Sequence, residues 1–158
     1  MNTELMFSSA TDKWDTPADL VADLATVFDW DLDVCASGPN VCENYYTEAD
    51  NSLLKIWLGL CWMNPPYGRG ISQWVARAVG QSEAHRNTTV VCLVPARTDT
   101  KWFQNATYYA SQVVFIRGRL KFGDATNSAP FPSAFIVFGE INDAQRAKLA
   151  NYGWSVTP

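Results

Sequence analysis

Apolar positions recur along the chain with two different periods, and these periods predict its helices and strands. Residues 17–28 carry apolar side chains at helical spacing. Thr16-Pro17 is a typical helix start, with Thr as the N-cap and Pro in the first helical position. From residue 28 to residue 34 apolar residues alternate with aspartates, which predicts a strand. Residues 44–47 are a candidate second strand.

Continuous apolar runs alternate with helical patterns in the rest of the chain. The runs predict strands over residues 58–63, 90–94, 113–116 and 134–138. Helices are predicted around residues 71–82 and from a cap at Thr98 or Asp99 to about residue 110. This alternation predicts a compact α/β fold with a mostly parallel central sheet. No repeat or linker interrupts it, so we interpret residues 1–158 as a single domain.

Polar residues follow three of the predicted strands. Asp33 ends the first strand, Asn64 follows the second, and Pro95-Ala96-Arg97 follows the third. In open α/β sheets ligands bind beyond the carboxyl ends of the strands. We therefore expect the functional site at this edge.

Composition excludes several classes of protein. Hydrophobic residues make up 47% of the chain and charged residues 18%, which is typical of a folded globule. Residues 1–10 lack the basic start of a signal peptide, and no apolar run reaches membrane-spanning length. The four cysteines have no CxxC spacing and lie in or beside apolar stretches, which indicates reduced thiols in a cytoplasmic protein. Because His85 is the single histidine, we expect no metal site. Because no apolar run is long enough to span a membrane, we expect no membrane partner.

The net charge of −4 conceals a strong segregation of charge. Residues 1–50 hold eleven acids and one base, residues 51–121 hold nine bases and two acids, and residues 122–158 hold three acids and two bases. A polyanion responds to the local potential and not to the net charge. The basic segment is therefore a candidate nucleic-acid face, although ordinary solvated faces can also segregate charge.

The tetrapeptide Asn64-Pro65-Pro66-Tyr67 follows a predicted buried strand. Neither proline can donate to a sheet ladder, and each forces the residue before it into an extended conformation. We expect a stiff backbone that holds the Pro65 carbonyl and the Asn64 amide oxygen outward as acceptors, beside the ring of Tyr67. Such a group suits a planar substrate with an exocyclic amino group. A lone match would also fit enzymes that act on glutamine side chains or RNA bases.

Across nearly its whole length the chain resembles the small phage and prophage DNA N6-adenine methyltransferases of class I. The resemblance lies in segments of matching order and spacing: Trp14-Asp15-Thr16-Pro17, Leu32-Asp33-Val34-Cys35-Ala36-Ser37, Asn40, Tyr45-Tyr46-Thr47, Trp62-Met63-Asn64-Pro65-Pro66-Tyr67-Gly68, Leu93-Val94-Pro95-Ala96-Arg97-Thr98-Asp99-Thr100, Gly118-Arg119-Leu120-Lys121-Phe122 and Ser128-Ala129-Pro130-Phe131-Pro132-Ser133. It implies a Rossmann-like fold that uses S-adenosylmethionine to methylate adenine in DNA. The loop after the first strand departs from the glycine-rich pattern of class I enzymes, with Gly38 alone. The short stretch from Asp33 to Asn64 indicates a trimmed cofactor half.

The resemblance implies a role for each candidate residue. Asn64, Pro65, Pro66 and Tyr67 are the catalytic set, and Tyr67 is expected to stack on a base rotated out of the duplex, with its ring face more important than its hydroxyl. Cofactor contacts are expected from Trp14, Thr16, Pro17, Asp33, Ala36, Asn40 and Asp50. Among these, Asp33 and Asn40 suit the amino-acid end of the cofactor and Asp50 its ribose hydroxyls. Trp14 could instead be a helix staple, and Asp50 a solvated loop acid.

DNA phosphates are the expected partners of six basic residues near the strand ends: Arg69, Arg97, Lys101, Arg117, Arg119 and Lys121. Methylation of RNA, methylation of cytosine N4, and a catalytically silent DNA-binding module remain alternatives. The pattern indicates neither a recognition sequence nor an oligomeric state.

Alanine at Arg117, Arg119 and Lys121 together is expected to flatten the salt dependence of DNA binding. Each lost phosphate contact lowers the slope of log affinity against log salt by roughly 0.9 for duplex DNA. DNA titrations over a salt series measure this slope, and cofactor affinity is expected to stay unchanged. An unchanged slope in a folded variant would place the DNA elsewhere.

Overall fold

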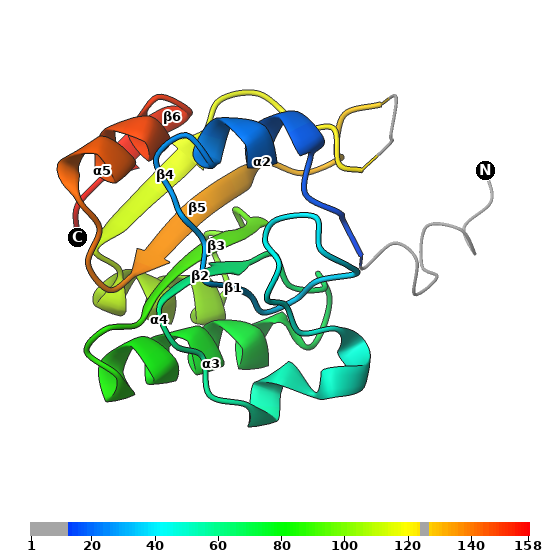
Figure 1. The fold of residues 1–158 in the computed structure, drawn as a ribbon. Coiled ribbons are helices and arrows are strands. Elements are labelled where there is room, and N and C mark those ends of the chain that lie inside the picture. The colour runs from blue at the N-terminus through cyan, green and yellow to red at the C-terminus, as the bar shows by residue number, and fades with distance from the viewer. Residues whose placement is uncertain (1–12, 124–126) are drawn as a thin grey trace.

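A computed structural model describes residues 13–123 and 127–158. The expectation that residues 1–10 form no signal peptide lies outside the described residues. The described chain forms a six-stranded sheet in the order β1-β2-β3-β5-β4-β6 (Figure 1). The strands are β1 (Leu32–Asp33), β2 (Leu60–Met63), β3 (Thr89–Pro95), β4 (Gln112–Ile116), β5 (Ser133–Phe138) and β6 (Gly153–Val156).

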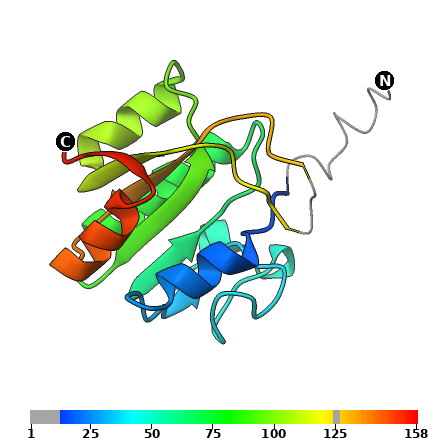
Figure 2. The same cartoon turned by 90° about the horizontal axis from the view of Figure 1, so that it is seen from above.

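Helices cover both faces of the sheet. On one face lie α3 (Ile71–Ala84) and α4 (Lys101–Tyr109), and on the other lie α2 (Ala18–Leu24) and α5 (Asp143–Ala150) (Figures 1 and 2). Two 3-10 turns, η2 (Glu48–Asp50) and η3 (Ser52–Leu54), precede β2. The buried apolar residues from Leu20 to Leu149 form one core cluster.

The α/β prediction is confirmed, but the prediction of a mostly parallel sheet is wrong. The pairs β1–β2 and β2–β3 are parallel, whereas β3–β5, β4–β5 and β4–β6 are antiparallel. The reason lies in the connection between β4 and β5, whose described residues, 117–123 and 127–132, contain no crossover helix. A loop can return the chain only in the opposite direction beside its own strand, whereas parallel neighbours need a crossover. The sheet is therefore mixed.

The strands β1, β2, β3 and β4 nevertheless share one direction. Since β5 is antiparallel to both of its neighbours, β3 and β4 run the same way. Their carboxyl ends meet at one edge, where the chain continues into Asn64, Ala96 and Arg117. The predicted convergence of strand ends is present in the fold.

Local boundaries differ from the predictions where tertiary contacts intervene. Pro17 is the N-cap of α2, and no side chain caps this helix, so Thr16 is not the cap. The Thr16 hydroxyl accepts hydrogen bonds from Trp62 and Asn64 instead. The candidate strand at residues 44–47 is reduced to an isolated bridge between Asp33 and Tyr45.

Other differences also have local causes. Strand β2 begins two residues later than predicted, because Gly59 has a φ of 85° and Leu58 is exposed. Thr100, and neither Thr98 nor Asp99, caps α4 by accepting from the Phe103 amide. Residues 143–156 were not predicted to be structured, yet they form α5 and β6.

The C-terminal elements hold α2 in place. Lys148 donates to the Asp23 carboxylate at 2.8 Å, and the Tyr152 hydroxyl bonds to the same group. These two donors lower the pKa of Asp23. The Gln145 side chain donates to the Val27 carbonyl at 3.1 Å, just beyond the helix. A pair of elements at the end of the chain thus fixes an element near its beginning.

Among the described helices, none has the length and apolar character needed to cross a bilayer.

Gly153→Ala is expected to destabilise the fold, whereas Gly80→Ala is expected to stabilise it. A Cβ at Gly153 would lie 1.8 Å from the Phe115 carbonyl oxygen, while a Cβ at Gly80 meets nothing within 4 Å. Overpacking costs about 1–3 kcal/mol, and replacing glycine inside an exposed helix gains about 0.5–1 kcal/mol. Urea unfolding of both variants measures the two changes. Equal effects would show that β6 does not pack against β4 as described.

Candidate functional site

A cavity of about 840 Å³ lies at the carboxyl ends of β1 and β2. Its wall includes the segment before α2, the loop after β1, both 3-10 turns and the start of α3. The predicted site residues that line it are Trp14, Thr16, Asp33, Ala36, Asn40, Asn64, Pro65 and Pro66. A concave site of this size is within the range of small-molecule pockets.

The side chain of Asn64 is held by three groups, two of them from a distant part of the chain. Its Nδ2 donates to the Trp14 carbonyl and, at 3.0 Å, to the Thr16 hydroxyl oxygen. Its Oδ1 lies 2.8 Å from the Tyr67 hydroxyl, which donates to it. An amide oxygen has two lone pairs, so Oδ1 keeps one for a further donor.

Pro65 and Pro66 lie where the chain leaves the sheet after β2. Pro65 is buried and Pro66 is partly buried, and both follow the last residue of β2. Within the described ranges no hydrogen bond is made to the Pro65 carbonyl oxygen. Asn64 and Pro65 therefore each offer an acceptor lone pair at adjacent positions.

Tyr67 occupies a different environment from the one predicted. It is 5% exposed, and its ring meets Phe122 and Phe131 edge-on at centroid distances of 6.0 and 5.5 Å. Its hydroxyl lies within reach of both Asn64 Oδ1 and the Leu93 carbonyl, at 2.8 and 3.0 Å. Burial raises the pKa of Tyr67 well above its ordinary value. A base could stack on this ring only after the side chains that cover it move.

Asp33 is a buried carboxylate at the wall of the cavity. It is 4% exposed, and its side chain accepts a hydrogen bond from the Cys35 amide at 3.2 Å. Burial raises the pKa of Asp33 from 3.8 to about 6, and the Cys35 amide opposes this shift. Among the described residues no cation pairs with it, because the ion pairs there are Lys13–Glu48 and Lys148–Asp23. The carboxylate would gain from a positively charged ligand.

Two of the predicted cofactor residues do not line the cavity. Pro17 is buried at the start of α2. The Asp50 carboxylate accepts from both the amide and the hydroxyl of Thr47, at 2.8 and 3.1 Å, in a capping box. Trp14 does line the cavity, and it also packs edge-on against Phe122 and Phe131.

The prediction missed several lining residues that the 3-10 turns bring in. Glu48 lies in the wall, two residues before Asp50, and it pairs with Lys13 at 3.0 Å. Ser52 also lies in the wall, and its buried hydroxyl has no hydrogen-bond partner among the described residues. The run of acids and small polar residues over 47–52 was a usable signal, but the turn geometry decides which of them face the cavity.

A family model and two curated relatives that match this chain carry the same description. The family model described as DNA N-6-adenine-methyltransferase (Dam) matches residues 4–146. Two curated relatives, from Haemophilus phage HP1 and Escherichia phage T1, carry the name DNA N-6-adenine-methyltransferase. Each is 37% identical, over 117 and 114 residues respectively, and each match covers 69% of this chain.

The chain belongs to the Dam family. The matched region covers 66% of the Haemophilus phage relative and 46% of the Escherichia phage relative. The chain thus spans about two thirds of one relative and under half of the other.

The six basic residues predicted to contact DNA are all exposed in this Dam-family chain. Each lies on a segment that leaves the carboxyl end of β2, β3 or β4, so the topology brings their segments to the edge that holds Asn64. The Arg119 guanidinium donates to the Ala129 carbonyl at 3.5 Å, and none of the six is in an ion pair among the described residues. Their contact with DNA remains a prediction.

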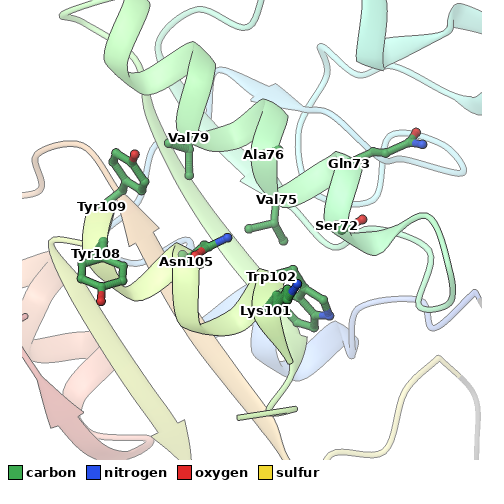
Figure 3. A pocket seen from close by; sticks show the side chains of 11 residues that line it. Ser72, Gln73, Val75, Ala76, Val79, Lys101, Trp102, Asn105, Tyr108 and Tyr109 are labelled. Carbon is green, nitrogen blue, oxygen red and sulfur yellow. The ribbon is translucent and has the colours of Figure 1, made fainter. Parts of the chain in front are cut away.

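A second hollow of about 720 Å³ lies between α3 and α4 (Figure 3). Val75, Val79, Trp102 and Tyr109 line it, and Gln73 lines both this hollow and the cavity beside Asn64. No residue of the tetrapeptide lines it. Within residues 13–123 and 127–158 no group of three or more His, Cys, Asp or Glu side chains is placed to hold a metal ion.

Asp33 is expected to make the fold less stable as the pH rises from 4 to 6. The unfolded carboxyl ionises near 3.8, whereas the folded one keeps its proton to about 6, so the unfolded state binds fewer protons in this window. The full cost above pH 6 is about 3 kcal/mol.

The measurement is the difference in unfolding free energy between the Asp33→Asn variant and the unmodified protein, taken by urea unfolding from pH 4 to 7. The difference is expected to grow in favour of the variant as the pH rises. A difference that does not change with pH would show that Asp33 is solvated.

Proposed function

We propose that this protein transfers a methyl group from S-adenosylmethionine to the N6 amino group of adenine in DNA. The observation that carries the proposal is the pair of adjacent acceptors, Asn64 Oδ1 and the Pro65 carbonyl, at the wall of a cavity in a Dam-family chain. The names of the two phage relatives support the same substrate. The single core cluster supports one Rossmann-like methyltransferase domain over residues 1–158.

The two acceptors act on the amino group of the substrate. An adenine amino group is a weak nucleophile because its lone pair is delocalised into the ring. When Asn64 and Pro65 each accept one of its N–H groups, the nitrogen becomes more pyramidal and its lone pair is directed away from the ring. Fixed acceptors of this kind catalyse by positioning and by preorganised dipoles. Water can take the proton that the methylated amine loses.

The cavity fits S-adenosylmethionine in its volume and in its unused polar groups. Asp33 has no cationic partner in the described structure and suits the ammonium of the amino-acid end, with Asn40 beside it. For the ribose hydroxyls we propose Glu48 in place of Asp50, because Glu48 lines the cavity and Asp50 does not. The Ser52 hydroxyl is a further unpartnered group in this wall. When bound, the sulfonium supplies an electrophilic methyl group, so the residues need only bind and orient.

The exposed Arg and Lys side chains at the same edge suit DNA phosphates. Rotation of the target adenine out of the duplex would bring it to Asn64. Tyr67 and its partners Phe122 and Phe131 offer ring surfaces for that base once they separate. The free thiols are consistent with action in the cytoplasm of a bacterial host.

The test is transfer of radiolabelled methyl groups to duplex DNA, RNA and protein, followed by nucleoside analysis. The expected product is N6-methyladenine in DNA. N4-methylcytosine in DNA, or label in RNA, would contradict the proposed substrate. Absence of label from DNA, RNA and protein would indicate a catalytically silent binding module.

Asn64→Ala is expected to lower the single-turnover rate on DNA at least about a hundredfold, as does the loss of one transition-state hydrogen-bond partner in other enzymes. Cofactor affinity, measured by calorimetry, is expected to change little. Asn105→Ala is a matched control, since this asparagine is exposed on α4 and does not line the cavity. Near-normal methylation by Asn64→Ala would remove the tetrapeptide from the mechanism.

A further inference from the structure

The orientation of the Asn64 amide depends on residues far away in the sequence. Its Nδ2 group donates to Trp14 and Thr16, which come 50 and 48 residues earlier. The chemistry proposed for Asn64 requires that its oxygen, and not its nitrogen, faces the substrate amino group. The groups that fix the amide orientation therefore determine whether Asn64 can accept a hydrogen bond from the substrate.

The neighbours of Asn64 distinguish the two orientations. The Trp14 carbonyl has no proton, so a reversed amide would place two oxygens against each other there. The Thr16 hydroxyl oxygen also accepts from Trp62 Nε1 at 3.3 Å, and an indole N–H can only donate. With Asn64 Nδ2 at 3.0 Å, both lone pairs of this hydroxyl oxygen are in use. A hydroxyl can also donate to a reversed amide, so the Trp14 carbonyl selects the orientation and Thr16 holds the Nδ2 group in it.

The opposite end of the amide agrees with this arrangement. The single proton of the Tyr67 hydroxyl has two acceptors within reach, Asn64 Oδ1 at 2.8 Å and the Leu93 carbonyl at 3.0 Å. Donation to the nearer of them, Oδ1, leaves the second lone pair of that oxygen open. Three groups, from Trp14, Thr16 and Tyr67, thus satisfy the Asn64 amide in this orientation.

We propose that Thr16 is a positioning residue for methyl transfer: its hydroxyl oxygen, with the Trp14 carbonyl, holds the Asn64 amide so that Oδ1 is the group presented to the substrate. This rests on the proposed function. It assigns Thr16 a role distinct from cofactor binding, although Thr16 also lines the cavity. It also explains why Thr16 does not cap α2, since its oxygen is occupied by Trp62 and Asn64.

A double-mutant cycle tests the proposal. Thr16→Val keeps the shape and removes the acceptor, and it is expected to lower the single-turnover rate about tenfold at saturating cofactor, the effect of one hydrogen bond. Thr16→Ser is expected to retain most of the rate. In an Asn64→Ala background, Thr16→Val is expected to cause no further loss, because the group on which it acts is gone.

The outcomes separate this proposal from the proposed function. Equal losses from Thr16→Val with and without Asn64 would overturn it, as would a Ser variant as slow as the Val variant. A loss that disappears at saturating cofactor would make Thr16 a cofactor contact instead. A normal rate in Asn64→Ala alone would contradict the proposed function and not the geometry at Thr16.

A spectroscopic readout is independent of activity. In ¹⁵N-labelled protein the side-chain amide signals of Asn64 are identified by their absence from Asn64→Ala. They are expected to shift and to exchange faster with water in Thr16→Val and Thr16→Ala, but not in Thr16→Ser. Thr26→Val is the matched control, because among the described residues that hydroxyl bonds only to the Asp23 carbonyl. Unchanged Asn64 signals in folded Val and Ala variants would overturn the proposal.

Discussion

The common direction of β1, β2, β3 and β4 is the constraint on which the rest of the structure depends. It places four chain exits along one edge of the sheet, although β5 and β6 run the other way. These strand ends supply three kinds of group: a carboxylate at the end of β1, an amide with two prolines after β2, and exposed basic residues after β3 and β4. A functional site of this composition needs no inserted domain within the described chain, because the topology alone collects it.

The two polar groups at the centre of this edge are prepared in different ways. Asn64 is fully engaged on its nitrogen and half engaged on its oxygen, so the protein fixes its orientation before any ligand arrives. Asp33 is buried without a cation, and burial holds its pKa near 6. Hydrogen bonds fix the position of the Asn64 acceptor. Desolvation leaves Asp33 as a carboxylate that a cationic ligand would stabilise. Both features are typical of sites that bind charged, polar molecules.

The sequence was sufficient for those features that are set locally. The uninterrupted apolar run around Val90–Val94 predicted a central buried strand, and the two prolines after Asn64 predicted a stiff exit from the sheet. Features set by distant partners were not accessible. Thr16 has the local signature of an N-cap, but Trp62 and Asn64 compete for the same oxygen. Asp50 and Glu48 differ only in how a 3-10 turn rotates them.

The direction of the strands and the existence of short, weakly apolar elements could not be predicted from the sequence pattern either. A continuous apolar run predicts a strand but not its direction, so the run over residues 134–138 could not show that β5 inserts between β3 and β4 in the opposite direction. The helix α5 buries Leu149 as its one fully covered apolar side chain, and its start depends on a capping box at Asn142. Such a helix gives little periodic signal, because contacts with the rest of the protein stabilise it more than its own apolar face does.

The hydrogen bonds from Lys148 in α5 and from Tyr152 just before β6 connect the end of the chain to α2. The family match ends at residue 146, whereas Lys148 and Tyr152, which bind Asp23, come after it. The helix that they fix continues directly from the Trp14–Thr16 segment, which orients Asn64. The C-terminal residues therefore act as a strut: they do not line the cavity, yet they hold the short helix that follows the segment bonded to Asn64. A Dam-family protein without this strut must anchor the same helix by another contact, so the requirement belongs to the architecture even where the residues change.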